Sequence, residues 1–96
     1  MEYHSVIKKM REMKGLTQND LALKSGLSIT YISMLENGKK SPTIRTLAKI
    51  SKSLDIPNSI LTFLCLQEED VDDDLRVYFN KINSTFMEII KEHYDL

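Results

Sequence analysis

Residues 17–38 read TQNDLALKSGLSITYISMLENG and predict two short helices joined by a tight turn. Thr17 can cap the first helix, because Asp20 three residues later completes a T-x-x-D capping box. Gly26 ends that helix at a position that favours a left-handed backbone conformation. Ser28 can cap the second helix, which continues to the end of the stretch. The stretch therefore predicts two helices that cross each other closely.

The ordered run T-Q-x-x-L-A-x-x-x-G-L-S-x-x-Y-I-S-x-x-E-N-G-x-x-x-P extends this pattern, together with Leu47, Ile50 and Leu54 further along the chain. This set resembles the phage-repressor/Cro-type helix-turn-helix family, often called the XRE family, over residues 5–66. The resemblance implies a compact five-helix domain whose second motif helix lies in the DNA major groove. In size the chain is also similar to the controller proteins of restriction–modification systems.

Helical spacing of apolar residues predicts the other elements of this domain. The first helix is expected over residues 4–14, where apolar side chains share one face. A fourth helix is expected to begin after Pro42, and a fifth over residues 58–66. The inward stripe of the fourth helix comprises Ile44, Leu47, Ala48, Ile50 and Leu54. The fold class is therefore all-α, and the resemblance makes residues 1–66 a DNA-binding domain.

Charge divides the chain into two unlike parts. The net charge of −1 hides ten Lys or Arg against five Asp or Glu in residues 1–66, and three against nine in residues 67–96. A basic part followed by an acidic part suits a polyanion-binding head joined to a different module. Residues 67–74, QEEDVDDD, are expected to form a solvated linker whose last aspartates cap the next helix. Mimicry of DNA, or binding of a basic partner, is the alternative for this segment.

Residues 75–96 predict an amphipathic helix of a different kind. Its apolar residues are spaced by four and three, which is the seam of a coiled coil. The seam comprises Leu75, Phe79, Ile82, Phe86 and Ile89, widened by Tyr78, Ile90 and Tyr94. It can fold back over the fifth helix or pair with a second copy, and pairing with Phe63 in the interface is the expected outcome. The sequence therefore predicts a homodimer.

The resemblance and the exposed face of the second motif helix together define the expected DNA contacts. Base contacts are expected from Ser28, Ile29, Thr30 and Met34, where well-known family members place several glutamines. For Ile29 and Met34, packing within the fold is the alternative. The family positions that touch the DNA backbone are matched by Gln18, Tyr31, Ser33, Asn37 and Lys39, with added charge from Lys40 and Arg45. The resemblance also implies a bidentate ion pair between Arg11 and Glu36 that links the first and third helices.

No arrangement of residues indicates catalysis, a metal site or another cofactor. His4 and His93 lie at opposite ends of the chain, and with Cys65 they cannot supply four zinc ligands. Cys65 is expected to be an inert core thiol rather than a redox sensor. No apolar run approaches the roughly 18 residues of a membrane span, and no signal-peptide region opens the sequence. A cytoplasmic location is therefore expected.

The expected function is that of a homodimeric regulator of transcription that binds double-stranded DNA at a pseudo-palindromic operator. Repression by blocking polymerase is the expected mode, and activation from an adjacent site is the alternative. A rival from another class is an antitoxin-like interaction module, whose acidic C-terminal helix grips a protein partner. A second rival, a ligand-responsive regulator, is disfavoured because too few residues follow the first domain to form a separate pocket.

Overall fold

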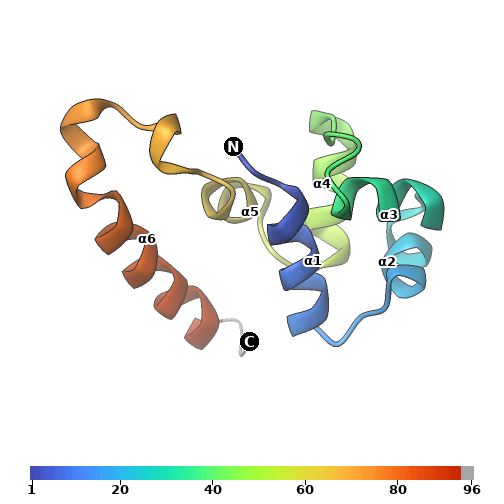
Figure 1. Ribbon diagram of the computed structural model, residues 1–96. Helices are drawn as coiled ribbons and strands as arrows, with labels where there is room; N and C mark the ends of the chain where they lie inside the picture. Colours follow the sequence, from blue (N-terminus) through green and yellow to red (C-terminus); the bar gives the residue numbers. More distant parts are fainter. Residues whose placement is uncertain (94–96) are drawn as a thin grey trace.

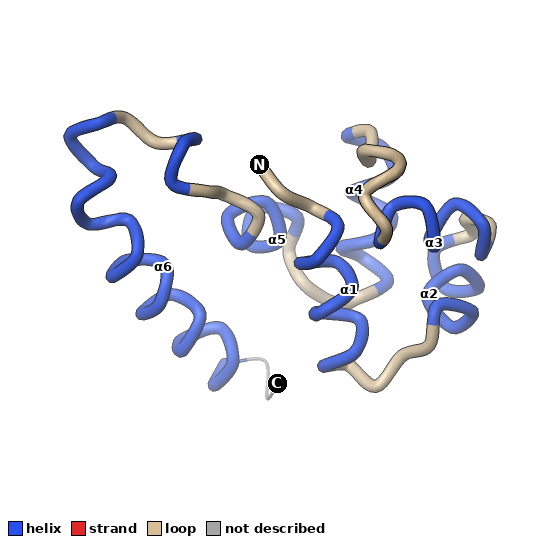
Figure 2. Tube along the Cα trace, viewed as in Figure 1, coloured by secondary structure: helices blue, strands red, loops and turns tan. Residues whose placement is uncertain are grey.

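The computed structural model describes residues 1–93 as an assembly of α-helices (Figures 1 and 2). In chain order the elements are α1 (His4–Met13), α2 (Gln18–Ser25), α3 (Ile29–Glu36), α4 (Ile44–Ser53), α5 (Asn58–Leu64), the short 3₁₀-helix η1 (Glu68–Asp70) and α6 (Asp73–His93). The all-α fold class is confirmed, with α5 ending and α6 beginning slightly before their predicted limits. Tyr94, which the sequence assigns to the C-terminal seam, lies outside the described residues.

The hydrophobic core lies where α1 to α5 meet (Figure 1). Its fully buried side chains include Ile7, Met10, Leu21, Ile32, Leu35, Ile50, Leu54 and Leu61. Residues three or four apart supply this core within each helix, because that is the period at which one face of an α-helix recurs. α3 packs on both α1 and α2, and α2 also packs on α4. α3 is therefore held from two sides.

The buried stripe of α4 differs in part from the predicted one. Leu47 and Ile50 are buried as predicted, but Ile44 is 88% exposed and Ala48 is also exposed. Both lie roughly a quarter to a third of a turn around the helix from the centre of the stripe, at 100° per residue. Ser51 occupies the inward position instead, and its hydroxyl donates to the Ala48 carbonyl oxygen at 3.0 Å. The prediction for Ile44 and Ala48 is therefore wrong.

Local caps define the turn between α2 and α3 as predicted. The Thr17 backbone N–H donates to the Asp20 carboxylate at 2.9 Å, and the Asp20 N–H donates to the Thr17 hydroxyl at 3.0 Å. Gly26 has a φ of 72°, in the left-handed region that favours glycine at the end of a helix. The Ser28 hydroxyl oxygen accepts from the Tyr31 backbone N–H at 3.0 Å, so it caps α3. The predicted capping residues and helix-ending glycine are confirmed.

Residues 67–74 form more structure than the predicted solvated linker. The Gln67 backbone N–H donates to the Asp70 carboxylate at 2.9 Å, and the Met1 ammonium donates to the same carboxylate at 2.9 Å. The hydrogen bond from the ammonium, followed by that from Gln67, lowers the pKa of Asp70. The last two aspartates of the segment lie inside the first turn of α6, where the helix dipole favours negative charge as predicted, rather than capping the helix from outside it. The segment is therefore tied to the N-terminal residues as well as leading into α6.

α6 lies beyond α5, on the side of the molecule away from α2 and α3 (Figure 1). The Phe86 ring packs on the Phe63 ring of α5, with ring centroids 4.2 Å apart. Phe86 and Met87 both pack against the hydrophobic core, and Ile90 is buried. One face of α6 thus folds back over its own domain, which is one of the two arrangements that the sequence left open.

A different face of α6 remains exposed. It comprises Leu75, Tyr78, Ile82, Thr85 and Ile89, spaced alternately by three and four residues. We call this set the α6 outer strip. The predicted seam is therefore divided, because Phe79 and Phe86 are half-buried while the other three members are exposed. The sequence pattern could not make this distinction, since apolar residues occupy more than one stripe of α6.

Candidate nucleic-acid interface

The first turn of α3 faces solvent, while the opposite side of the helix is buried in the core. Ser28 and Thr30 are exposed, and Ile29 is 47% exposed. The exposure of Ile29 argues against the alternative that it serves as a packing residue. Met34 is half-buried and divides its surface between the fold and solvent. The structure thus brings three of the four predicted base-contacting residues together on an open surface.

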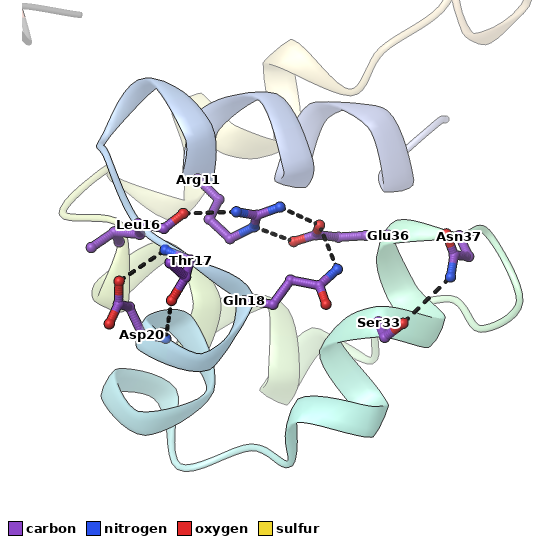
Figure 3. A network of polar contacts seen from close by, with 8 residues as sticks. All are labelled: Arg11, Leu16, Thr17, Gln18, Asp20, Ser33, Glu36 and Asn37. Carbon is purple, nitrogen blue, oxygen red and sulfur yellow. Dashed lines mark hydrogen bonds and ion pairs between the residues drawn. The ribbon is translucent and has the colours of Figure 1, made fainter.

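A buried polar network fixes α3 relative to α1 and α2 (Figure 3). Arg11 Nε and Nη2 donate to Glu36 Oε2 and Oε1, both at 2.8 Å. Arg11 Nη1 donates to the Leu16 carbonyl oxygen at 2.7 Å. The Arg11 and Glu36 side chains are only 10% and 1% exposed, and hydrogen bonding to Glu36 raises the pKa of Arg11. The bidentate pair that the resemblance implies is therefore present.

Gln18 joins this network from the start of α2. Its Nε2 donates to Glu36 Oε1 at 3.2 Å (Figure 3). An amide nitrogen carries two N–H groups, so the second can still serve the predicted DNA phosphate contact. The bond to Glu36 also restricts where that second N–H can point. Gln18 therefore links the buried network to the surface where α2 begins.

The other predicted backbone-contacting residues run from α3 through the following loop to the start of α4. The Tyr31 hydroxyl donates to Thr46 Oγ1 at 3.4 Å, which connects α3 to the first turn of α4. The Lys40 ammonium lies 5.9 Å from the centroid of the Tyr31 ring. Asn37 Nδ2 donates to Ser33 Oγ at 3.4 Å (Figure 3). These contacts hold an aromatic hydroxyl and an ammonium group between α3 and α4, and an amide at the end of α3.

The start of α4 is held by a capping box of two threonines that was not predicted. The Thr46 backbone N–H donates to Thr43 Oγ1 at 3.1 Å, and the Thr43 N–H donates to Thr46 Oγ1 at 2.8 Å. The T-x-x-T spacing directly after Pro42 is the signal that could have identified this capping box. Lys39 and Arg45 are exposed close to it in the sequence. The box therefore fixes the start of α4, the helix that carries Arg45.

This surface has the properties that binding to a DNA groove requires. An exposed helix start can reach base edges, while nearby cations and helix N-termini can contact phosphates. The Arg11–Glu36 pair holds the helix in one orientation before DNA arrives. The fold and the surface together define a helix-turn-helix DNA-binding protein.

Comparison with known proteins identifies the family. A family model described as helix-turn-helix (HTH_3) matches residues 7–57, which is more than half of the chain. The chain therefore belongs to the XRE-type helix-turn-helix family of DNA-binding regulators. Membership of this family places it among regulators rather than enzymes.

Several relatives share this domain. The HTH-type transcriptional regulator y4dJ of Sinorhizobium fredii is 40% identical over 48 residues, covering 50% of this chain and 62% of the relative. The ImmF control region 10 kDa protein of Bacillus phage phi105 is 33% identical over 63 residues, covering 66% and 70%. The repressor RghR of Bacillus subtilis is 36% identical over 76 residues, covering 78% and 56%. The chain thus spans less than two thirds of y4dJ and of RghR.

A solved structure shows the same likeness in three dimensions. The crystal structure of an arginine-to-alanine mutant of the restriction–modification controller protein C.Esp1396I has a TM-score of 0.60 and 43% sequence identity. The match covers 64% of this chain and 81% of the controller protein. The resemblance to phage repressors and to controller proteins, predicted from the sequence, is confirmed.

In the part of the chain that the structure describes, the remaining reactive groups do not form a second site. Cys65 is buried, and its burial raises the pKa of the thiol to about 12, so the thiol is protonated and unreactive at neutral pH. Within residues 1–93, no three His, Cys, Asp or Glu side chains are grouped so that they could hold a metal ion. Over the same residues, no helix combines the length and apolar character needed to cross a membrane.

Proposed function

We propose that this protein is a sequence-specific regulator that binds a pseudo-palindromic operator as a homodimer and represses transcription by blocking polymerase. One observation carries the proposal: the buried Arg11–Glu36 pair holds the exposed start of α3 in a fixed orientation. A fixed orientation supports specific binding because less ordering is needed when DNA is bound. In this proposal residues 1–66 form the DNA-binding domain, residues 67–74 link it to the C-terminal helix, and residues 75–96 form the dimerisation helix.

Base reading is assigned to Ser28, Ile29, Thr30 and Met34. The Ser28 and Thr30 hydroxyls can hydrogen-bond to base edges, while Ile29 and Met34 can contact thymine methyl groups. These positions carry no arginine, asparagine or glutamine for bidentate contacts, which discriminate bases by about 1–3 kcal/mol each. Specificity is therefore expected to depend also on the shape and deformability of the operator.

Contacts with the DNA backbone are assigned to polar and basic side chains that flank α3. They comprise Gln18, Tyr31, Ser33, Asn37, Lys39, Lys40 and Arg45. A dimer that makes roughly 6–10 phosphate contacts should lose about 10³–10⁵ in affinity between 50 and 200 mM salt. A markedly shallower salt dependence would contradict this assignment.

Selection of bound fragments from random DNA, combined with the mass of the protein–DNA complex, tests the proposal. The expected result is an inverted repeat with half-sites about 34 Å apart, bound by two copies of the chain. A monomer that enriches no sequence would refute it. A reporter gene placed behind the selected operator then separates repression from the alternative, activation.

The base-reading role of Thr30 has its own test. Thr30→Ala should change the preference at one or two base pairs of the operator, because it removes a hydroxyl and a methyl group from the exposed helix start. Ser59→Ala is a suitable control, because it removes an exposed hydroxyl from α5, outside the proposed surface. An unchanged preference at every base pair would remove Thr30 from the reading set.

An antitoxin-like interaction module is the second candidate, and the exposed α6 outer strip favours it. In that case the strip binds a different protein rather than a second copy of this chain. A neighbouring toxin-like reading frame whose product forms a stable complex with the full chain would support this function. The DNA selection separates the two, since an interaction module alone need not enrich an inverted repeat.

A further inference from the structure

The α6 outer strip has the pattern of a surface that packs against another helix. Ile82 and Ile89 are 50% and 56% exposed, and with Lys81, Thr85 and Phe86 they line a shallow groove of about 330 Å³. The strip continues towards the start of α6 along an almost straight line, because its spacing alternates between three and four residues. A second α6 has the matching pattern, so we take a second copy of this chain as the occupant.

Charges beside the strip distinguish the two directions in which two α6 helices could pair. Lys81 and Glu88 are both exposed and lie seven residues apart on the same flank of the strip. In an antiparallel pair centred between Ile82 and Thr85, Lys81 lies opposite Glu88 of the partner subunit. By symmetry, Glu88 lies opposite Lys81 of the partner subunit. In a parallel pair, Lys81 instead faces the apolar Phe86 of the partner subunit.

The ends of α6 favour the same direction. Residues 72–74 are three successive aspartates at the start of the helix, whereas Lys91 and Glu92 balance each other in its last turn. Parallel pairing brings the two acidic starts together, which like charges oppose. Antiparallel pairing separates the two acidic starts and opposes the two helix dipoles, which is the favourable arrangement.

The attachment of the domain to α6 gives a third reason. Asn83, Met87 and Ile90 lie roughly a third of a turn or more around α6 from the outer strip, at 100° per residue. Asn83 and Met87 line a cavity of about 250 Å³ together with α1 residues, so this side of α6 faces the domain. The twofold axis of an antiparallel pair is perpendicular to the helices and therefore displaces both domains sideways in the same direction. The axis of a parallel pair runs along the helices and displaces the domains sideways in opposite directions.

We propose that two copies of this chain associate through an antiparallel pairing of their α6 outer strips, with Lys81 of each copy opposite Glu88 of the partner subunit. The inference rests on the proposed homodimer and adds its direction and register. α3 lies on the side of the domain away from α6 (Figure 1), so this pairing leaves both α3 helices clear of the interface and free to bind DNA. The charge pairs fix the register along an otherwise apolar strip.

Charge exchange in the full chain tests the direction. Lys81→Glu and Glu88→Lys should each raise the dimer dissociation constant about tenfold, because each replaces two attractive pairs by repulsive ones. An equimolar mixture of the two variants should form heterodimers about as stable as the wild-type dimer, since all pairs across the interface are then complementary. Lys49→Glu, an exposed charge reversal on α4, is the matched control and should have no effect on self-association.

Disulfide formation provides a second readout. A mixture of Tyr78→Cys and Ile89→Cys chains, one of them tagged, should form the mixed disulfide under mild oxidation, while Val77→Cys, which lies off the strip, should not cross-link. Disulfides between identical chains, or a mixture of charge variants no tighter than either alone, would overturn the antiparallel arrangement. If the arrangement fails but the wild-type chain is a dimer and still selects an inverted repeat, the proposed function remains supported. A wild-type chain that stays monomeric overturns both the arrangement and the dimer.

Discussion

Replacement of Arg11 by methionine should severely destabilise the domain. Methionine keeps much of the apolar stem but removes the guanidinium, which leaves the Glu36 carboxylate 1% exposed with only the 3.2 Å contact from Gln18. Loss of one partner from a buried ion pair costs about 3–5 kcal/mol. The whole stability of a small domain is only about 5–15 kcal/mol. The variant should therefore lose a large share of its folding free energy, and the Leu16 carbonyl also loses its donor.

The double variant Arg11→Met/Glu36→Leu separates the value of the pair from the cost of leaving one charge alone. Removal of both charges in favour of apolar side chains is often close to neutral. We expect the double variant to be more stable than Arg11→Met alone by about 2 kcal/mol or more. Such a difference would show that the loss of stability in Arg11→Met arises from the buried Glu36 carboxylate left without its partner.

Urea unfolding followed by far-ultraviolet circular dichroism measures these differences, provided that unfolding is two-state. Arg76→Met is the matched control, because it removes the same group from a pair with Asp73 whose side chains are 42% and 89% exposed. Such an exposed pair contributes about 0–1 kcal/mol. If Arg11→Met costs no more than Arg76→Met, the buried network does not anchor α3 and the proposed basis for groove binding is wrong.

Three further results are expected. Gly26→Ala should lower the free energy of unfolding by about 1 kcal/mol and the Tm by roughly 4–8 °C, because alanine disfavours the left-handed φ of 72° at this position. A new Cβ would meet no atom within 4 Å, so a larger loss of stability would contradict this reasoning. Hydrogen bonds from the Thr17 backbone and hydroxyl lower the pKa of Asp20, so its contribution is present above its ordinary pKa and is lost as the pH falls through the lower folded value. Urea midpoints at neutral and acidic pH should therefore differ less for Asp20→Asn than for wild type, and an equal difference would contradict this. Ile82→Lys should abolish self-association in sedimentation measurements, whereas Val77→Lys, at an exposed position off the outer strip, should not.

The parts of the fold that depend on near neighbours in the sequence could be predicted. Thr17 and Asp20 cap α2 because their spacing alone brings the two groups together, and Ser28 and Gly26 act in the same local way. Such positions need no knowledge of the rest of the chain. They are therefore confirmed without adjustment.

The parts that depend on tertiary packing could not be predicted in the same way. Ile44 has the sequence character of a core residue, but the direction of the α4 stripe is set by what α2 and α5 cover. Phe86 fits a coiled-coil seam equally well, but its ring meets Phe63 of the same chain. Helical periodicity shows which residues share a face and does not show which face the domain will cover.

The candidate site falls between these cases. Arg11 and Glu36 are 25 residues apart, so no local pattern can pair them, and only the family resemblance indicated their contact. The bond from Tyr31 to Thr46 likewise depends on how α4 is placed against α3. Base reading by Thr30 stays a prediction, although the exposure of the helix start favours it.

Association through the α6 outer strip would couple DNA binding to protein concentration. The exposed aliphatic residues of the strip contribute at most about 1.5–3 kcal/mol each when fully buried, and association costs about 4–15 kcal/mol. Leu75, Ile82 and Ile89 alone therefore predict a weak dimer in free solution. An operator with two half-sites favours the paired state, and by linkage the paired state must favour the operator by the same factor. Operator occupancy would then rise with nearly the square of the protein concentration, which makes a small chain with a weak pairing helix a sharper switch than a permanent dimer.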